Sequence, residues 1–539
     1  MEHKNKSLAT ATSEAQGACA VSMVDRLSSV PCKVAHRILS LVSFKDLTCV
    51  GSLSKRCREY YLSNPSLKLS SLFGNRQRQL NFLNCCDRYM ICRRGDKIKS
   101  FSIQWDFSAG TSEESFRMMT WILIAVRCNV EVLDLQLRLN RKDGATLQLP
   151  SCIYCCESLR SLLINTETII KAPSFACPNN LQYLKLTTVT MDDGFGKWIS
   201  CSCKCIKELL LKDVHVGSFT IESSSLESFT LSYTYNCEPC YFSISGEKLA
   251  EVNIKWETEA NSSITRSLNV YAPNLKYLKW IGDLLDYQNL GKFMCLEKAQ
   301  IFLKCQRSDY DFDNAIEVLC SFYKAKSLVL SGETIKVKIH HLSVTFFVQN
   351  PVSLNRILGA HISSVVTLIF VILQVLLREG SLHAPLDGTT YLGMHVKSLS
   401  DDLVPAMVSL LRGMPNLKTL YINSYPSLNV AKPKACGFKK KYWKSQNLDC
   451  IHQLEEVSIS LSTGYPTNAL ELAIYILEHA PKLKKMVIYY LRRRQLYIIE
   501  KVNKSKKVSS ATVIFKEREV DDDEAMGDMY YRQLYRWYW

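Results

Sequence analysis

Paired cysteines are the side chains of this sequence whose type and spacing most resemble a chemical site. Cys152 and Cys155 are separated by two residues, as are Cys237 and Cys240, which is the spacing of a zinc-ligand pair. Three more cysteines alternate with other residues, at Cys201, Cys203 and Cys205. The two pairs lie far apart and no His pair accompanies them, so they do not fit a compact zinc module. We interpret all these thiols as small hydrophobic residues inside the fold, and we predict neither a metal nor another cofactor.

The motifs of common catalytic sites are missing from the sequence. It contains no G-x-S-x-G nucleophile elbow, no P-loop, no kinase signature and no H-E-x-x-H zinc motif. We therefore predict that the chain is not an enzyme and has no catalytic residue, which directs attention to binding.

Length and composition indicate an ordinary folded protein. Of the 539 residues, 47% are hydrophobic and 22% are charged, which argues against global disorder and leaves room for a small module plus a repeat array. The formal net charge is +16, from 67 Lys and Arg against 51 Asp and Glu, but the basic residues are scattered. A solvated repeat surface explains this charge better than loose attraction to nucleic acid or anionic lipid, so no specific nucleic-acid partner is expected.

Residues 1–23 are polar and small, and they lack the apolar core of a secretory signal. We expect a disordered leader there, and we expect the protein in the nucleus or cytoplasm. Because such a compartment is reducing, the 22 cysteines are not expected to form a disulfide framework.

Three short helices are expected in residues 24–67. Pro31 suits the first turn of a helix, because its missing N–H is no loss there and its φ is already helical. Behind it, apolar residues recur on one helical face at Val34, Ile38, Leu41 and Val42. That face must be buried against another surface, and a three-helix unit is too small to cover all of it. A remainder that docks on a partner is the physical expectation.

The second and third helices have start signals of their own. Ser43 and Asp46 fit a capping box, which begins a helix with Leu47 and Val50 on its apolar side. A third helix is expected from about Ser54, with apolar residues at Leu53, Cys57, Tyr60 and Tyr61. We expect this three-helix unit and the rest of the chain to have separate cores.

The same stretch resembles, without a gap, the F-box of plant F-box proteins. The matching segments are DRLSS at 25–29, Pro31, HRILS at 36–40, KD at 45–46 and LSKR at 53–56. The departures from the family pattern are Cys32 and Lys33 in place of two acidic residues, Val42 and Ser43 in place of Leu-Pro, and Cys57 in place of Trp. The resemblance implies that the segment binds the Skp-type adaptor of a ubiquitin ligase and, through it, the cullin. A helical hairpin with no partner is the alternative.

The residues predicted to contact the adaptor come from this resemblance together with the apolar helix pattern. Three of them, Leu27, Pro31 and Ile38, match the contact pattern of the family. The full predicted set is Leu27, Pro31, Val34, Ile38, Leu41, Val42, Leu47, Val50 and Leu53.

From about residue 130 the sequence repeats the pattern apolar-x-x-apolar-x-apolar. The units are Val130/Leu133/Leu135, Leu159/Leu162/Ile164, Leu181/Leu184/Leu186, Ile206/Leu209/Leu211, Leu226/Phe229/Leu231, Leu249/Val252/Ile254 and Leu275/Leu278/Trp280, with weaker ones at Leu296/Ala299/Ile301 and Ala325/Leu328/Leu330. An irregular period in the twenties is typical of leucine-rich repeats. One unit cannot bury its own leucines, so a stacked solenoid with a curved parallel β-sheet is predicted. Its second positions, Leu162, Leu184, Leu209 and Leu278, should form one buried column. An ordinary α/β domain is the alternative.

Residues 357–377 interrupt the repeats. This segment has no charged residue and is almost wholly apolar from residue 365 onward, so its length would allow a membrane span. The repeat pattern nevertheless resumes at Tyr391/Met394/Val396. We interpret the segment as a buried helix or as an insertion foreign to the repeat, and consider a membrane association the weaker interpretation. A transmembrane helix and a gene-model artefact are the alternatives.

The last part of the chain resembles the FBD domain, which follows the repeats in many plant F-box proteins. Strand-like triads continue at Leu417/Leu420/Ile422, Leu454/Val457/Ile459 and Leu483/Met486/Ile488, with a helix at 468–479 and a last strand at 510–515.

The predicted organisation is a leader (1–23), an F-box (24–67), a junction (68–129), leucine-rich repeats (130–425), an FBD-like domain (426–515) and a tail (516–539). In the junction a helix is expected at 114–128, with Phe116, Met119, Ile122, Leu123 and Val126 on one side.

Two functions follow from these predictions. In the first, the chain is the substrate-recognition subunit of a Skp–cullin–F-box ubiquitin ligase, whose solenoid binds a target protein of unknown identity. In the second, it is a non-catalytic leucine-rich scaffold whose F-box has degenerated.

Overall fold

The computed structural model describes the chain between Ser29 and Arg518. The description has single-residue or two-residue breaks, and its longer breaks are 71–75, 108–111, 139–148, 174–179, 235–239, 258–265, 304–320, 335–385, 425–437, 462–466 and 491–494. The predicted leader, Leu27, Cys237, the apolar segment 357–377 and most of the tail lie outside the described residues.

Helices occur mainly in the first third and the last third of the described chain. They are α1 (Cys32–Leu39), α2 (Phe44–Gly51), α3 (Lys55–Leu62), α4 (Arg76–Cys92), α5 (Ser112–Arg127), α6 (Gly194–Ser202), α11 (Val404–Arg412), α12 (Lys440–Ser445), α13 (Thr467–His479) and α14 (Gln495–Asn503), with 3₁₀ turns η2 (Ser151–Ile153) and η4 (Asp449–Gln453). Among the described residues, no helix combines the length and apolar character needed to cross a membrane.

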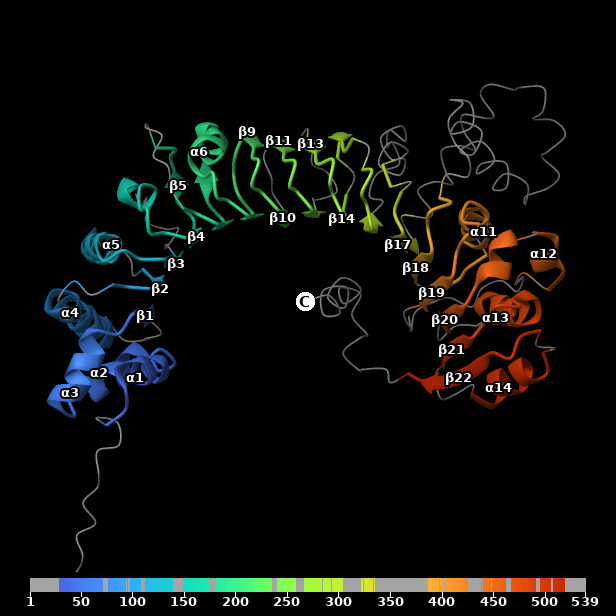
Figure 1. The fold of residues 1–539 in the computed structure, drawn as a ribbon, viewed down its shortest axis with the longest axis horizontal. Coiled ribbons are helices and arrows are strands. Elements are labelled where there is room, and N and C mark those ends of the chain that lie inside the picture. Colours follow the sequence, from blue (N-terminus) through green and yellow to red (C-terminus); the bar gives the residue numbers. More distant parts are fainter. Residues whose placement is uncertain are drawn as a thin grey trace, which may run out of the picture.

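The main sheet is a single parallel array. Its strands, in spatial order, are β1 (Ser66–Ser70), β2 (Ser100–Asp106), β3 (Val132–Arg138), β4 (Ser161–Thr166), β6 (Tyr183–Thr187), β8 (Glu208–Lys212), β10 (Ser228–Thr234), β12 (Glu251–Glu257), β14 (Tyr277–Gly282), β16 (Lys298–Leu303), β17 (Ser327–Ser331), β18 (Tyr391–Val396), β19 (Thr419–Ser424), β20 (Glu456–Ser460), β21 (Lys485–Tyr490) and β22 (Thr512–Glu517). These strands follow an arc and line its inner side, while the helices lie outside it (Figure 1). The α/β solenoid predicted from the repeats is confirmed.

In the middle of the arc, the return segments are strands instead of helices. A second parallel sheet joins β9 (Ser218–Glu222), β11 (Cys240–Ser245), β13 (Arg266–Tyr271) and β15 (Tyr287–Asn289), and a third joins β5 (Ile169–Ile170) with β7 (Thr190–Met191). The second sheet lies on the outer side of β10 to β14 (Figure 1). Short returns of this kind fit the irregular period in the twenties.

A column of apolar side chains runs through the solenoid at one register. Leu162 pairs with Leu184, which pairs with Leu209, and the row continues through Phe229 and Val252 to Leu278. The four predicted leucines are at most 2% exposed. Because side chains alternate along a strand, the residues between the column positions point into the hollow of the arc. The predicted buried column is confirmed.

The register of β18 differs from the prediction. Leu392 and Met394, instead of Met394 and Val396, pair with Leu328 and Leu330. The first position of the unit is therefore Thr389, whose hydroxyl donates to the carbonyl of Ala325 at 2.8 Å. A two-residue shift keeps the same side chains facing inward, so hydrophobicity alone does not distinguish the two registers.

The predicted boundaries do not interrupt the main sheet. Strands β1 and β2 lie at or within the predicted junction, and β20, β21 and β22 extend the same sheet through the FBD-like part. The division into separate domains stays a prediction, whereas the sheet itself is continuous.

The inward face of α5 also differs from the prediction. Its buried residues include Met118, Trp121, Ile122 and Ala125, whereas Phe116 is 73% exposed and Leu123 is 37% exposed. Trp121 Nε1 donates to Asp87 of α4 at 2.7 Å, which turns this side of the helix toward α4. The predicted face was rotated by about one residue, or roughly 100° around the helix axis.

Candidate functional site

Helix α1 begins where the sequence predicted. Pro31 is its N-cap, with φ −57° and ψ 141°, and its carbonyl accepts from the N–H groups of Val34 and Ala35 at 2.9 and 3.0 Å. No acidic residue stands in the first turn. The helix therefore lacks the favourable interaction of a carboxylate with its N-terminal dipole, typically 0.3 to 1 kcal/mol each.

Helices α2 and α3 are both capped by serine. The Asp46 N–H donates to Ser43 Oγ at 3.2 Å, and Ser43 Oγ donates to the Asp46 carboxylate at 2.7 Å. The N–H of Cys57 donates to Ser54 Oγ at 3.1 Å. Both predicted starts, Ser43 and about Ser54, are confirmed. Such caps contribute typically about 1 kcal/mol each, so these short helices are well defined by local interactions.

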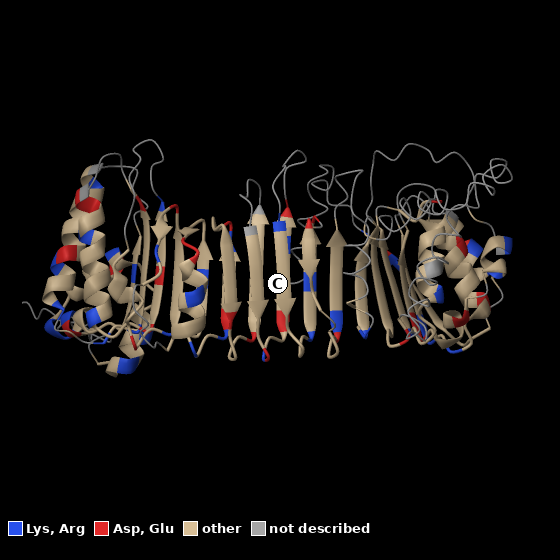
Figure 2. Cartoon of the chain, turned by 90° about the horizontal axis from the view of Figure 1, so that it is seen from above, with Lys and Arg blue, Asp and Glu red and all other residues tan. Residues whose placement is uncertain are grey.

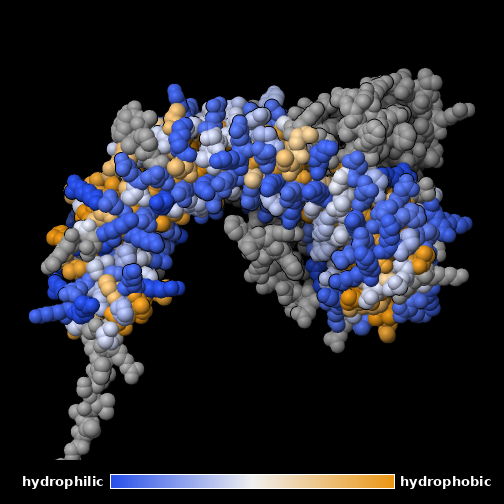
Figure 3. Space-filling view, viewed as in Figure 1, coloured by the Kyte–Doolittle hydropathy of each residue, from blue (hydrophilic) through white to orange (hydrophobic). Residues whose placement is uncertain are grey.

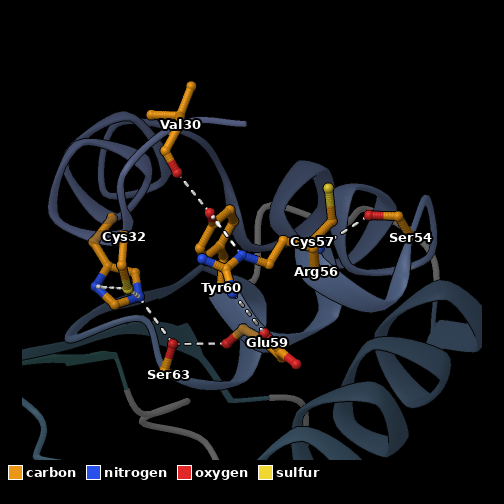
Figure 4. A network of polar contacts seen from close by, with 9 residues as sticks. Val30, Cys32, Ser54, Arg56, Cys57, Glu59, Tyr60 and Ser63 are labelled. Atoms are coloured by element: carbon orange, nitrogen blue, oxygen red, sulfur yellow. Dashed lines mark hydrogen bonds and ion pairs between the residues drawn. The ribbon is translucent and has the colours of Figure 1, made fainter. Parts of the chain in front are cut away.

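Tyr60 joins α3 to the start of α1. It is 1% exposed, and its hydroxyl donates to the carbonyl of Val30 at 2.6 Å, which ties α3 to the residue before the N-cap of α1 (Figure 4). His36 of α1 contacts Ser63 Oγ through Nε2 at 2.9 Å. Cys57 is also buried at 1%, so a small thiol packs in this core at the place where the family pattern has Trp.

The three-helix unit is joined to the solenoid through aromatic rings. Phe44 of α2 lies edge-on to Phe82 and Tyr89 of α4, with ring centroids 5.6 and 5.3 Å apart. Tyr61 of α3 lies 4.7 Å from Tyr89, and the Tyr89 hydroxyl donates to the carbonyl of Tyr61 at 3.1 Å. The buried residues of both parts belong to one hydrophobic core. The expectation of separate cores was therefore wrong.

One face of the helical unit is left apolar and exposed. Val34 is 49% exposed, Ile38 45%, Leu41 85% and Leu53 71%, and Pro31 is exposed as well. We call these five residues the helix-face patch. Hydrophobic residues are visible at the surface of the end of the arc that carries α1–α3 (Figure 3). In α1 the residues that pack inward are instead Ala35 and Leu39.

The remaining predicted adaptor contacts are less accessible. Val42 and Val50 are half-buried against the core, and Leu47 is 2% exposed, so Leu47 belongs to the core and not to the open surface. Leu27 lies outside the described residues. Five of the nine predicted positions are thus exposed, and four of them, Pro31, Val34, Ile38 and Leu41, follow one helical face of α1.

Basic residues predominate on the helical unit that carries the helix-face patch. The exposed cations of α1 to α3 are Lys33, Arg37, Lys45, Lys55, Arg56 and Arg58, whereas the acidic residues of these helices are Asp46 and Glu59. Arg56 forms an ion pair with Glu59 at 3.4 Å and stacks over the Tyr60 ring at 5.2 Å (Figure 4). Elsewhere along the arc, positive and negative residues are interspersed (Figure 2). A partner of this patch would experience a locally positive rim.

The cysteines do not assemble into a site within the described part of the chain. No group of three or more His, Cys, Asp or Glu residues is placed there to hold a metal ion. Cys152 and Cys155 are half-buried, and burial raises the pKa of the Cys152 thiol. Cys203 is buried as interpreted, but Cys201 and Cys205 are exposed, so the interpretation of these two thiols as packed inside the fold was wrong.

A second apolar feature, which the sequence analysis did not single out, lies on the inner face of the main sheet. Ile281 of β14, Phe302 of β16 and Val329 of β17 are only 2 to 3% exposed, and they form a cluster separate from the main core, with Tyr391 of β18 packed against it. We call these four residues the concave-face cluster. The sequence did contain a signal for this cluster. At inward-facing positions where β2, β3 and β10 carry Ser, Asp, Gln or Thr, these strands carry apolar residues.

The fold and the helix-face patch define a class of protein: a small helical unit with an open apolar face, joined to a leucine-rich-repeat-type parallel sheet. Comparison with curated proteins of Arabidopsis thaliana agrees with this class. The chain is 22% identical over 480 residues to a putative F-box/FBD/LRR-repeat protein, covering 87% of this chain and 93% of the relative. It is 22% identical over 349 residues to an F-box/LRR-repeat protein, covering 61% and 86%. A further F-box/FBD/LRR-repeat protein is 26% identical over 242 residues, covering 44% and 56%.

No protein-family model matches the chain. The relatives nevertheless agree with one another in their names, and two of the three similarities extend over most of each relative. They support the assignment of this chain to the plant F-box/LRR-repeat proteins, with an FBD part, and a role in protein interaction.

Proposed function

We propose that this chain is the substrate-recognition subunit of a Skp–cullin–F-box ubiquitin ligase. The helix-face patch binds the Skp-type adaptor, the adaptor binds the cullin, and the solenoid holds a target protein. The chain itself supplies binding and no chemistry, and it acts in the nucleus or cytoplasm. The observation that carries the proposal is the exposure of Leu41 and its apolar neighbours beside a fully formed helical core.

The energetics of the patch suit a docking surface. Fully burying a side chain such as Leu, Ile or Val is worth roughly 1.5 to 3 kcal/mol. Only the surplus over the cost of association appears as affinity, so several such side chains must act together. The helical unit exposes four large aliphatic residues, Val34, Ile38, Leu41 and Leu53, which provides that number. Their backbone is held by Pro31, by the serine caps and by Tyr60, so little conformational entropy remains to be lost on binding.

The competing function, a scaffold whose F-box has degenerated, is tested by the lifetime of bound proteins. Plant cells would express tagged wild type, Leu41→Asp, or the matched control Leu496→Asp, which changes an 84% exposed leucine in α14. We expect cullin to co-purify with wild type and with the control, and proteins captured by the solenoid to turn over more slowly with Leu41→Asp. Absence of cullin from all three, together with equal lifetimes, would instead support the scaffold.

A further inference from the structure

The burial of the concave-face cluster is unusual for its position. Its side chains point into the hollow of the arc, away from the core that the leucine column forms. On an inner face, apolar side chains of this size normally mark a surface that something covers. Among the described residues, the hydrophobic side chain packed against Ile281, Phe302 and Val329 is that of Tyr391. Tyr391 and the His395 ring beside Phe302 do not account for exposures of 2 to 3% at three positions spread over three strands.

Aromatic rings continue the cluster toward the C-terminal end of the sheet. His395 of β18 lies 5.7 Å from the Phe302 ring and 6.0 Å from the ring of Tyr421 on β19. Gly393 lies between Val329 and Tyr391, and a Cβ at this position would approach the Val329 methyl groups at 3.2 Å and the Tyr391 ring at 3.3 Å. The glycine thus lets the Tyr391 ring lie close to the sheet. The result is a surface of aromatic rings that lie close to the sheet, from β16 to β19.

The described chain ends beside this surface. After β22, Arg518 donates its backbone N–H to the carbonyl of Tyr490 at 2.9 Å. Its guanidinium reaches back across β20 and donates to the carbonyl of Ser424 at 2.6 Å, and it lies 3.4 Å from Asn423 Oδ1. Asn423 is the register partner of His395. Arg518 is therefore anchored on β19, the last strand of the aromatic surface and the neighbour of the strand that carries His395.

The segment that follows has the composition and reach to cover it. Residues 519–539 end in YYRQLYRWYW, with six aromatic residues in ten positions. An extended chain spans about 3.3 Å per residue, so these residues reach roughly 70 Å, whereas β19 and β14 are four strand spacings, or about 20 Å, apart. Buried aromatic side chains cover about 150 to 250 Å² each, and paired rings gain about 0.5 to 1.5 kcal/mol beyond the area term.

From this geometry we propose that residues 519–539 bind the concave-face cluster of their own chain and occupy the surface that a target protein would use. Covalent attachment makes this binding effective even when the contact is weak. A segment held by a short linker has an effective concentration on the order of 1 mM. A contact with a Kd of about 100 μM would then be about nine-tenths occupied. The tail would act as a competitor in cis that a target has to displace.

The test compares the full chain with a chain truncated after Arg518, without adaptor, so that its outcome is independent of the proposed ligase function. A fluorescent peptide of residues 519–539 would be titrated into each protein, with a peptide whose six aromatic residues are replaced by Ser as control. We expect the truncated protein to bind the native peptide at least tenfold more tightly than the full chain does, and neither protein to bind the control peptide. Equal binding to both proteins, or no binding to the truncated one, would overturn the proposal.

A crosslinking experiment on the full chain locates the contact. A photoreactive phenylalanine analogue at position 302, or at Tyr421 if that variant does not fold, should crosslink to peptides from residues 519–539. Crosslinks that go only to other parts of the chain would overturn the proposal. Deleting residues 1–23 is the matched control, and it should leave the crosslinks unchanged.

Discussion

Replacing Leu184 by Asp perturbs the structural basis of the solenoid most directly. Leu184 is fully buried in β6 and lies in the apolar column between Leu162 and Leu209. Truncating a buried leucine to alanine costs about 2 to 5 kcal/mol. Burial of a carboxyl group raises its pKa by up to 3 to 5 units, which adds roughly 4 kcal/mol or more at neutral pH. The sum, about 6 kcal/mol or more, is comparable to the whole stability of a domain, about 5 to 15 kcal/mol.

A matched control is available on the neighbouring strand. Leu163 of β4 is half-buried on the opposite face of the sheet, and its register partner is Lys185. Leu163→Asp makes the same chemical change, but its carboxylate can remain solvated and faces a cation. Its expected cost is below about 1 kcal/mol, in the range of surface substitutions.

Urea unfolding followed by circular dichroism, together with limited proteolysis, measures the difference between the two variants. We expect Leu184→Asp to lose the cooperative transition, with cleavage sites opening in the repeats around β6, because each repeat depends on its neighbours. Leu163→Asp should keep a midpoint close to that of the wild type. A Leu184→Asp protein that unfolds at the same urea concentration as Leu163→Asp would refute the buried column.

Three further predictions concern other parts of the chain. Burial lowers the pKa of His395 to about 4, from an ordinary 6.5, so the unfolded state takes up a proton first as the pH falls. Stability should be complete above about pH 6.5 and decline by about 3 kcal/mol toward pH 4, and the decline should be smaller in His395→Gln when unfolding is measured across this range. The positive rim of the helix-face patch predicts that the association rate of an acidic adaptor falls as salt rises, and that Lys33→Glu/Arg37→Glu removes most of this dependence in stopped-flow measurements. Residues 357–377 are predicted to be a core helix or insertion, so alkaline washing of the membrane fraction should release the protein; retention in the pellet would contradict this.

Local signals made the helical unit predictable from its sequence. The bond between Ser43 and Asp46 joins residues three positions apart, and the start at Pro31 depends on one residue, so both could be inferred without tertiary information. The column through Leu184 was predictable for a related reason, because it repeats in every unit.

The features that the sequence did not predict depend on contacts between distant residues. Phe44 contacts Phe82 and Tyr89 across the boundary between the helical unit and the solenoid. No local sequence pattern predicts that the two parts share a core. In α5, Phe116 is as apolar as the residues that do pack inward, so hydrophobicity alone did not fix the buried face. Before β18, the polar Thr389 takes the first position of the unit, and its hydrogen bond to Ala325 substitutes for an apolar contact.

The affinity of a purified Skp-type adaptor for three forms of the chain tests the central claim most directly. Isothermal titration calorimetry would compare wild type with Leu41→Asp in the helix-face patch and Leu496→Asp at the far end of the arc, which are 85% and 84% exposed leucines. We predict that the wild type and Leu496→Asp bind equally, and that Leu41→Asp binds at least about tenfold more weakly, at 1.4 kcal/mol per decade. Equal binding by all three would place the contact elsewhere, and no binding by the wild type would contradict the proposed function.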